Sequence, residues 1–178
     1  MARLNVVTPA QATGQTKALY DAIQGAIGMV PNIYQGLGNS PTALEGALHT
    51  DGLLKKGQLS GAEIEAIKLA VSQAYGCDYC LAAHTLLGKK AGLSDADALS
   101  IRRGTAQQPK IGALVKFVNA ALQPQSRISD ADLVAVKVAG YNDAQITEAV
   151  QAIAQTVYTN LFNRVHKTPL DFPAAPAL

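Results

Sequence analysis

The chain has no tryptophan, and aromatic residues of all kinds make up only 5% of its 178 residues. β-Strands are enriched in aromatic and β-branched side chains. Here 48% of the residues are hydrophobic, and alanine and leucine are prominent among them. This composition favours close-packed helices over a β-sandwich. The length suits one domain with a sizeable core.

Long apolar runs and a strong charge of one sign are also missing. No run reaches the roughly 20 residues that a membrane-spanning helix needs, and residues 1–5 lack the apolar stretch of a secretory signal. The formal charge is +2, from 15 basic and 13 acidic residues that are spread evenly. Such a balance argues against nucleic acid or an anionic membrane as a partner. We therefore expect a cytoplasmic protein that binds neither.

Helix signals recur along the chain, whereas clear strand signals do not. Typical starts are Thr8-Pro9, with a capping residue before proline, and the capping box Ser60-Gly61-Ala62-Glu63. The sequence predicts an all-α protein in a single domain, residues 1–178, with an extended proline-containing tail over 167–178. The expected helices cover residues 9–27, 33–37, 41–55, 63–75, 77–90, 95–103, 109–122, 130–139 and 143–163.

The chain has only two cysteines, and they form a Cys-x-x-Cys pair, Cys77 and Cys80, followed by His84. On a helix, where successive residues turn by about 100°, these three positions share one face. In a reducing compartment such a pair is more often a working redox pair or half of a metal site than a structural crosslink. Two thiols beside a titratable imidazole are the minimum parts of a thiol redox site.

The surroundings of the pair favour activated thiols. Both cysteines fall in the first turn of the expected helix, where unpaired N–H groups and the helix dipole favour a thiolate. His84 can accept the thiol proton. If the break at Gly76 folds the two helices back on each other, Glu65 of the preceding helix reaches the site and orients His84.

Other interpretations of these residues stay open at this point. The cysteines with His84 and Glu65 offer four ligands for zinc, although structural zinc favours a second paired motif that the chain lacks. The cysteines can also act as small buried hydrophobic residues, and Glu65 as an ordinary residue of a helix surface. The two further histidines, His49 and His166, have no identifiable partner, and we expect them to be at the surface or hydrogen-bonded.

The segment 59–92, with Glu65, Cys77, Cys80 and His84, resembles the core motif of the alkylhydroperoxidase AhpD-like group of the carboxymuconolactone decarboxylase superfamily. The pattern is a glutamate, eleven residues, Cys-x-x-Cys, three residues and a histidine. Short segments elsewhere are similar to the longer peroxidase-related members, so that the resemblance covers most of the chain; these are residues 30–32, 40–41 and 160–163.

The resemblance implies an all-helical fold and a homo-oligomer, either a trimer or a hexamer built from trimers. It also implies weak peroxidase activity on organic hydroperoxides or hydrogen peroxide, with no metal or haem. By position, Cys80 matches the peroxidatic cysteine and Cys77 the more exposed resolving cysteine, while Glu65 and His84 match the proton relay. Tyr79 stands where the best-studied members carry a histidine. Those members take electrons from a lipoylated partner, so the expected dithiol donor is a lipoylated or thioredoxin-like protein.

The leading prediction from the sequence is a thiol-dependent peroxidase that cycles Cys77 and Cys80 between dithiol and disulfide. A second hypothesis is a cofactor-free lyase that decarboxylates lactone acids, although the members of that class lack the cysteine pair. A third is a non-enzymatic protein that uses the disulfide only as a redox switch or in an interaction.

Overall fold

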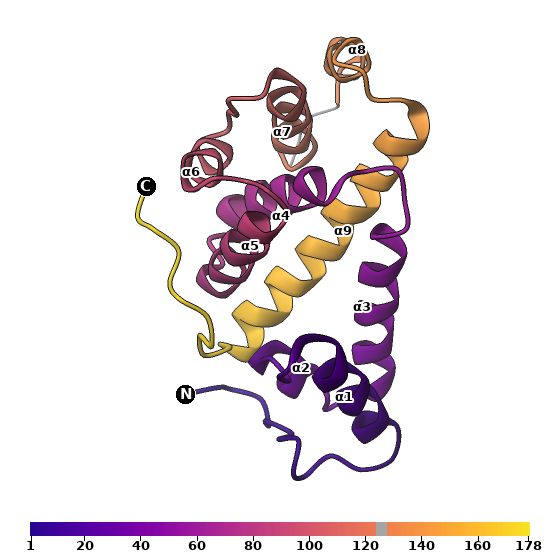
Figure 1. The fold of residues 1–178 in the computed structure, drawn as a ribbon, viewed down its shortest axis with the longest axis vertical. Coiled ribbons are helices and arrows are strands. Elements are labelled where there is room, and N and C mark those ends of the chain that lie inside the picture. The colour runs from indigo at the N-terminus through magenta and orange to yellow at the C-terminus, as the bar shows by residue number, and fades with distance from the viewer. Residues whose placement is uncertain (124–127) are drawn as a thin grey trace.

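The structure is a computed structural model that describes residues 1–123 and 128–178, and within these ranges it consists of α-helices without a β-strand (Figure 1). This confirms the all-α class expected from composition. The helices are α1 (Gly14–Ile27), α2 (Asn32–Leu37), α3 (Pro41–Leu54), α4 (Gly61–Tyr75), α5 (Asp78–Lys90), α6 (Asp95–Arg102), α7 (Pro109–Ala121), α8 (Asp130–Val138) and α9 (Asp143–His166).

Helix starts follow the capping signals closely. Ser60 Oγ accepts a hydrogen bond from the Glu63 N–H at 3.2 Å, and the Glu63 carboxylate accepts one from the Ser60 N–H at 2.8 Å. This confirms the predicted capping box of α4, and the same reciprocal arrangement opens α6, α8 and α9. Each cap satisfies N–H groups that would otherwise lack a partner, and is worth about 1 kcal/mol.

The predicted start of the first helix at Thr8-Pro9 is wrong, because α1 begins at Gly14. The Thr8 hydroxyl donates to the Gln11 side chain at 2.8 Å, and the Thr8 carbonyl accepts from the backbone N–H groups of Gln11 and Ala12. These bonds close a single turn. Gly14 then adopts a φ of 53°, in the left-handed region, which separates that turn from the helix.

Helix α4 lies at the centre of the fold and packs against α5, α6, α7 and α9 (Figure 1). Its side chains Ile67, Leu69 and Val71 are fully buried, in a core cluster with contributions from α3 through α9. Burial of each such side chain stabilises the fold by about 1.5 to 3 kcal/mol. A second cluster, around Tyr20 and Leu44, joins α1, α2 and α3.

The turn between α4 and α5 positions the cysteine motif. Gly76 ends α4 with φ 59° and ψ 42°, and the Cys77 N–H bonds back to the Ser72 carbonyl at 3.1 Å. This is the C-terminal capping geometry that glycine favours. The chain reverses there, so α5 lies against α4, as the break at Gly76 predicted.

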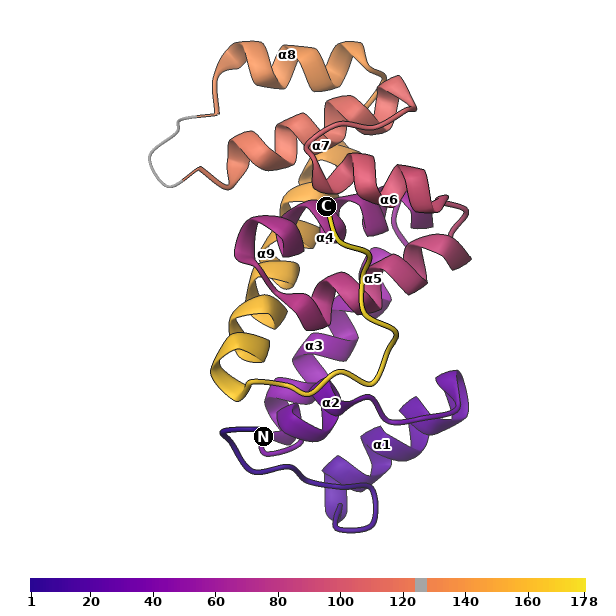
Figure 2. The ribbon, with the colours of Figure 1, turned by 90° about the vertical axis from the view of Figure 1, so that its left-hand side faces the viewer.

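The segment after α9 crosses the face of the molecule that carries α2 and α5 and approaches α6 (Figure 2). Asp171 accepts a hydrogen bond from the Asn32 N–H at 2.6 Å, and the Pro176 carbonyl accepts one from Arg102 at 2.6 Å. None of the helices in the described ranges combines the length and the apolar character that crossing a membrane requires.

Candidate redox site

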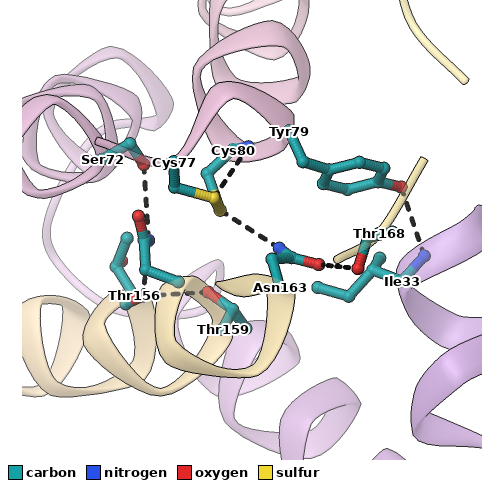
Figure 3. The surroundings of a disulfide bond; sticks show 10 residues. Ile33, Ser72, Cys77, Tyr79, Cys80, Thr156, Thr159, Asn163 and Thr168 are labelled. Carbon is teal, nitrogen blue, oxygen red and sulfur yellow. Dashed lines mark hydrogen bonds between the residues drawn. A yellow bond between two sulfur atoms is a disulfide. The ribbon is translucent and has the colours of Figure 1, made fainter. Parts of the chain in front are cut away.

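Cys77 and Cys80 are joined by a disulfide at the start of α5, with their Cα atoms 5.3 Å apart (Figure 3). Cys77 is the N-cap residue of the helix and Cys80 lies in its first turn. Both are buried, at 4% and 2% exposed. The pair therefore sits at the positive end of a helix dipole, which favours a thiolate when the bond is open. Burial acts in the opposite direction, because it disfavours the charged form.

Each sulfur accepts a hydrogen bond from a different donor (Figure 3). The backbone N–H of Cys80 donates to Cys77 Sγ at 3.3 Å, whereas Asn163 Nδ2 of α9 donates to Cys80 Sγ at 3.2 Å. Thr168 Oγ1 in turn donates to Asn163 Oδ1 at 2.6 Å. Reasoning from the sequence assigned no role to Asn163, because 83 positions separate it from Cys80.

Glu65 and His84 meet as predicted. Glu65 Oε2 lies 2.8 Å from His84 Nδ1, and Glu65 is only 7% exposed. A carboxylate only accepts hydrogen bonds, so Nδ1 carries the proton and Nε2 is left with a free lone pair in the neutral ring. Burial excludes the alternative that Glu65 is an ordinary surface residue. No hydrogen bond joins His84 to either sulfur within residues 1–123 and 128–178.

Two further charges extend this pair, and sequence reasoning missed both. Lys68, one turn along α4, places Nζ 3.7 Å from Glu65 Oε1 and 2.6 Å from Asp51 Oδ1 of α3. Lys68 is buried, because α4 is enclosed on nearly all sides. Asp51 also pairs with Lys55 at 2.6 Å near the surface. A chain of charges thus connects His84 to the surface at α3.

These charged groups shift one another's pKa values. Burial acts to raise the pKa of Glu65, but His84 and then Lys68 outweigh it and lower that pKa. Burial likewise opposes the charged form of Lys68, yet the Glu65 and Asp51 carboxylates raise its pKa. For Asp51, burial is outweighed by Lys68 and Lys55, which lower the pKa to about 2. Glu65 is therefore held as a carboxylate, the form that orients His84.

Tyr79 closes the site on the side of the C-terminal segment. Its ring packs edge-on against Phe172, with centroids 5.6 Å apart, and its hydroxyl accepts a hydrogen bond from the Ile33 N–H at 3.3 Å. Burial, followed by the Asp171 carboxylate, raises the pKa of Tyr79. The phenol therefore stays neutral and holds α2 and the C-terminal segment against the start of α5.

A cavity of about 170 Å³ reaches the disulfide from the side of Cys77. Its lining includes Cys77, Asn163 and Thr168, together with the exposed Arg164 and Lys167 at the end of α9. A larger cavity of about 320 Å³, between Asp78, Arg102 and residues 174–177, is lined by neither cysteine. Of these two cavities, only the smaller one is lined by a cysteine of the pair, Cys77.

The two remaining histidines, His49 and His166, differ in their exposure to solvent. His49 is exposed, as expected. His166 is completely buried, and neither ring nitrogen has a hydrogen-bond partner in the described part of the chain, so the expectation for it is wrong. Its ring stacks on Phe162 at 5.3 Å between centroids and lies where a side chain at Gly36 would clash. Burial lowers the pKa of His166, which packs as a neutral aromatic residue.

In the described ranges, no group of three or more His, Cys, Asp or Glu side chains has an arrangement that could hold a metal ion. Of the four residues in the zinc alternative, Cys77 and Cys80 bond to each other and Glu65 bonds to His84. The structure therefore presents them as two pairs.

Comparison with known proteins finds a family match for the segment that holds the motif and a shared fold for the whole chain. The family model described as "Carboxymuconolactone decarboxylase family" matches residues 41–123, which span α3 to α7 and contain the whole motif from Glu65 to His84. The AhpD-core peroxidase-related protein from Ralstonia eutropha JMP134 superimposes with a TM-score of 0.86 at 21% identity, over 96% of this chain and 92% of that chain. Residues 41–123 thus match the carboxymuconolactone decarboxylase family, and the chain as a whole has the AhpD-like fold.

Other solved AhpD-like structures align over similar lengths. A peroxidase-related protein from Silicibacter sp. TM1040 has a TM-score of 0.79 at 19% identity, over 95% of this chain and 94% of that chain. The debrominase Bmp8, as its C82A form in complex with 2,3,4-tribromopyrrole, has a TM-score of 0.78 at 15% identity, over 96% and 94%. No curated protein matches the chain significantly. Members of this superfamily are usually enzymes, and the fold is shared by proteins with different named activities.

Proposed function

We propose that this protein is a thiol-dependent peroxidase of the alkylhydroperoxidase type, which reduces organic hydroperoxides or hydrogen peroxide. The observation that carries the proposal is the disulfide between Cys77 and Cys80 at the start of α5, with the buried Glu65–His84 pair beside it. The likeness to two peroxidase-related proteins along almost the whole chain supports the same activity.

In the proposed cycle, the Cys80 thiolate attacks the terminal oxygen of the hydroperoxide and the O–O bond breaks. The leaving alkoxide takes a proton through His84 and departs as the alcohol, while Cys80 becomes a sulfenic acid. Cys77 then attacks that sulfur and hydroxide leaves as water, which completes the disulfide. Two thiols thereby lose two electrons and two protons, and the hydroperoxide becomes an alcohol and water.

Glu65 supports the proton transfers through the His84 ring. By holding the proton on Nδ1, it leaves Nε2 to receive and return a proton, as a positioned general base and acid does. Because His84 bonds to neither sulfur in the oxidised state, the proton passes between them through the bound hydroperoxide or a water molecule.

The cycle needs a dithiol that returns two electrons to the disulfide. A lipoylated or thioredoxin-like protein is the proposed donor, and a reducing compartment such as the cytoplasm is the proposed location, since the pair must be reopened after each turnover. A homo-oligomer, either a trimer or a hexamer, is the proposed assembly.

The test is turnover of cumene hydroperoxide and hydrogen peroxide with dithiothreitol as the reductant. We expect Cys80→Ser to abolish turnover. Exposed to hydroperoxide without dithiothreitol, reduced Cys77→Ser should oxidise once, to a sulfenic acid that dimedone traps. Glu65→Gln should slow turnover by about a hundredfold, as loss of general acid–base catalysis does. The matched control is His49→Gln, which changes an exposed histidine away from the site. Equal turnover in the wild type and both cysteine variants would contradict the proposal.

Reductive dehalogenation is a second candidate, because the debrominase Bmp8 has the same fold. The same dithiol would supply two electrons: an aryl bromide becomes the aryl hydrogen compound and bromide, and the thiols close to a disulfide. Bromide release from 2,3,4-tribromopyrrole by the reduced protein, without peroxide turnover, would favour it.

The two other hypotheses from the sequence predict different results in these assays. A lactone-acid decarboxylase would release carbon dioxide regardless of Cys80→Ser, and a redox switch would form the disulfide without catalytic turnover.

A further inference from the structure

Asn163 is the one side chain of the described residues that donates a hydrogen bond to Cys80 Sγ, at 3.2 Å. Both residues are buried, at 5% and 2% exposed. We propose that Asn163 is a catalytic residue of the dithiol cycle, whose amide N–H stabilises the negative charge on Cys80 whenever the disulfide opens. The inference rests on the proposed cycle and adds a residue from the far end of the chain to it.

The amide is held in the orientation that this role needs. An asparagine side chain has a donor end and an acceptor end, and only the donor end stabilises a thiolate. Thr168 Oγ1 donates to Asn163 Oδ1 at 2.6 Å, and the Thr168 N–H donates to the Asn163 carbonyl at 3.2 Å. Thr168 is thus anchored by its backbone while its hydroxyl occupies the acceptor end. The NH₂ group is directed at the sulfur (Figure 3).

The position of the cavity indicates which sulfur becomes the thiolate when a reductant opens the disulfide. Cys77 lines the cavity of about 170 Å³ and Cys80 does not, so a thiolate reductant that enters it attacks Cys77 Sγ. The Cys77–Cys80 bond breaks and its electron pair passes to Cys80, which leaves as a thiolate beside the Asn163 N–H. The second thiol of the reductant then attacks the mixed disulfide and releases Cys77. The reductant loses two electrons and two protons, and the cysteines gain them.

Burial makes the contribution of this donor large. A hydrogen bond to an ionised sulfur is about twice as strong as one between neutral groups, and more so away from water. Cys77 already has the backbone N–H of Cys80 as its donor. For Cys80, Asn163 fills the corresponding place. Because a better leaving group departs faster, the same contact speeds reduction and keeps Cys80 ionised for attack on a peroxide.

The experiment compares Asn163→Ala with Asn160→Ala. Asn160 lies one turn earlier in α9, is fully buried, and donates to the Thr156 carbonyl and to Ser72 Oγ instead of to a sulfur. Two quantities are measured. One is the rate constant for reduction of the disulfide by dithiothreitol. The other is the pH midpoint of iodoacetamide alkylation of Cys80 in a Cys77→Ser background.

We expect Asn163→Ala to slow reduction about tenfold and to move the alkylation midpoint up by about one pH unit, as loss of a charge-assisted hydrogen bond does. Asn163→Asp should have a larger effect, since its carboxylate repels the thiolate. Thr168→Val, outside the helix, should shift both quantities in the same direction by less. Asn160→Ala should lower only the unfolding temperature.

Equal effects of Asn163→Ala and Asn160→Ala, or no effect of Asn163→Ala and Thr168→Val, would overturn the inference. If Asn163→Ala does not fold, the same two measurements on Thr168→Val test the inference, because that variant removes only the hydroxyl that orients the amide. Neither measurement uses a peroxide. A wild type that reduces no peroxide contradicts the proposed function and leaves these two readouts valid, whereas peroxide turnover with unchanged readouts overturns the role of Asn163 alone.

Discussion

At the scale of single residues, a row of buried charges runs from His84 through Glu65 and Lys68 to Asp51. Lys68 is the cation between two carboxylates, and its charge keeps both of them ionised. A buried charge that loses its partner is costly, because neither water nor an opposite charge compensates it. The site therefore depends on a lysine that touches neither cysteine.

We expect Lys68→Met to destabilise the protein by about 3 kcal/mol at neutral pH, because it leaves Glu65 and Asp51 without their shared cation. Lys68→Arg keeps the charge and should cost less. The measurement is urea unfolding. Lys17→Met is the control, since Lys17 pairs with Asp21 at the exposed surface and should change stability by less than about 0.5 kcal/mol. A loss in Lys68→Met no larger than in Lys17→Met would contradict this role.

The Asp51 carboxylate gives a pH test. Its pKa is lowered to about 2 from an ordinary 3.8, so its ionised form stabilises the native state above pH 4, and this stabilisation disappears as pH falls from about 4 to about 2. We expect Asp51→Asn to be less stable than the wild type by about 2 kcal/mol at pH 6, with the difference closing by pH 2. Unfolding free energies across that range check it, and a constant difference would contradict the assigned shift.

The sequence could predict the residues of the site that share local spacing, and no others. Cys77, Cys80 and His84 follow from helical periodicity, and Glu65 from the break at Gly76. Lys68 is one turn from Glu65, yet the sequence alone predicts a lysine at the surface. Only the tertiary structure shows that Asp51 and the enclosing helices bury it. Asn163 comes from α9 and meets Cys80 only through the tertiary fold.

At the scale of elements, the α4–α5 turn holds the site together. Gly76 has a φ of 59°, and a side chain added there would meet no atom within 4 Å, so replacement costs only backbone strain. We expect Gly76→Ala to destabilise the protein by about 1 kcal/mol, the cost of a left-handed residue with a Cβ. It should also slow peroxide turnover, because Glu65 and His84 lie on the two helices that the turn joins.

The control is Gly46→Ala, within α3, where an added side chain is equally free of contacts and φ lies outside the left-handed region. There alanine should stabilise the protein by about 0.5 to 1 kcal/mol, because glycine is a poor helix former. Thermal unfolding of both variants measures the contrast, and two changes of the same sign would contradict the role of the turn.

Element boundaries were predictable where the capping group belongs to the helix that follows. Ser60, Ser94, Ser129 and Asn142 show this. Thr8 carries the same signal, but its hydroxyl and carbonyl bond within a single turn, and Gly14 reverses the backbone before α1. At the other end, α9 runs three residues past the predicted Asn163, until Lys167 adopts a left-handed φ of 56°.

At the scale of the whole molecule, α9 presents an apolar stripe to solvent. Val150, Tyr158, Leu161 and Val165 are exposed and fall within about 80° of one another around the helix. A stripe of this kind on a long helix is suited to contact with a second copy of the chain. We place the proposed homo-oligomer interface there. The helical class was predictable from composition, whereas the location proposed for the interface depends on which apolar side chains the core leaves uncovered.

We therefore expect Leu161→Asp to dissociate the assembly, because it puts a charge in the centre of the stripe. Light scattering coupled to gel filtration measures the mass of the particle. Val138→Asp on α8, which changes an exposed valine elsewhere, should leave the mass unchanged. An oligomer that survives Leu161→Asp would place the interface on another surface, and a monomeric wild type would remove it.

The most direct test of the central claim is a single encounter between the fully reduced protein and one equivalent of cumene hydroperoxide, quenched by alkylation and analysed by mass. We expect both thiols to disappear together, with a linked Cys77–Cys80 peptide and the corresponding alcohol, far faster than free cysteine reacts with the same hydroperoxide. Thiols that stay free, or that oxidise no faster in the native protein than in the unfolded chain, would contradict the claim that this site is a peroxide-reducing dithiol.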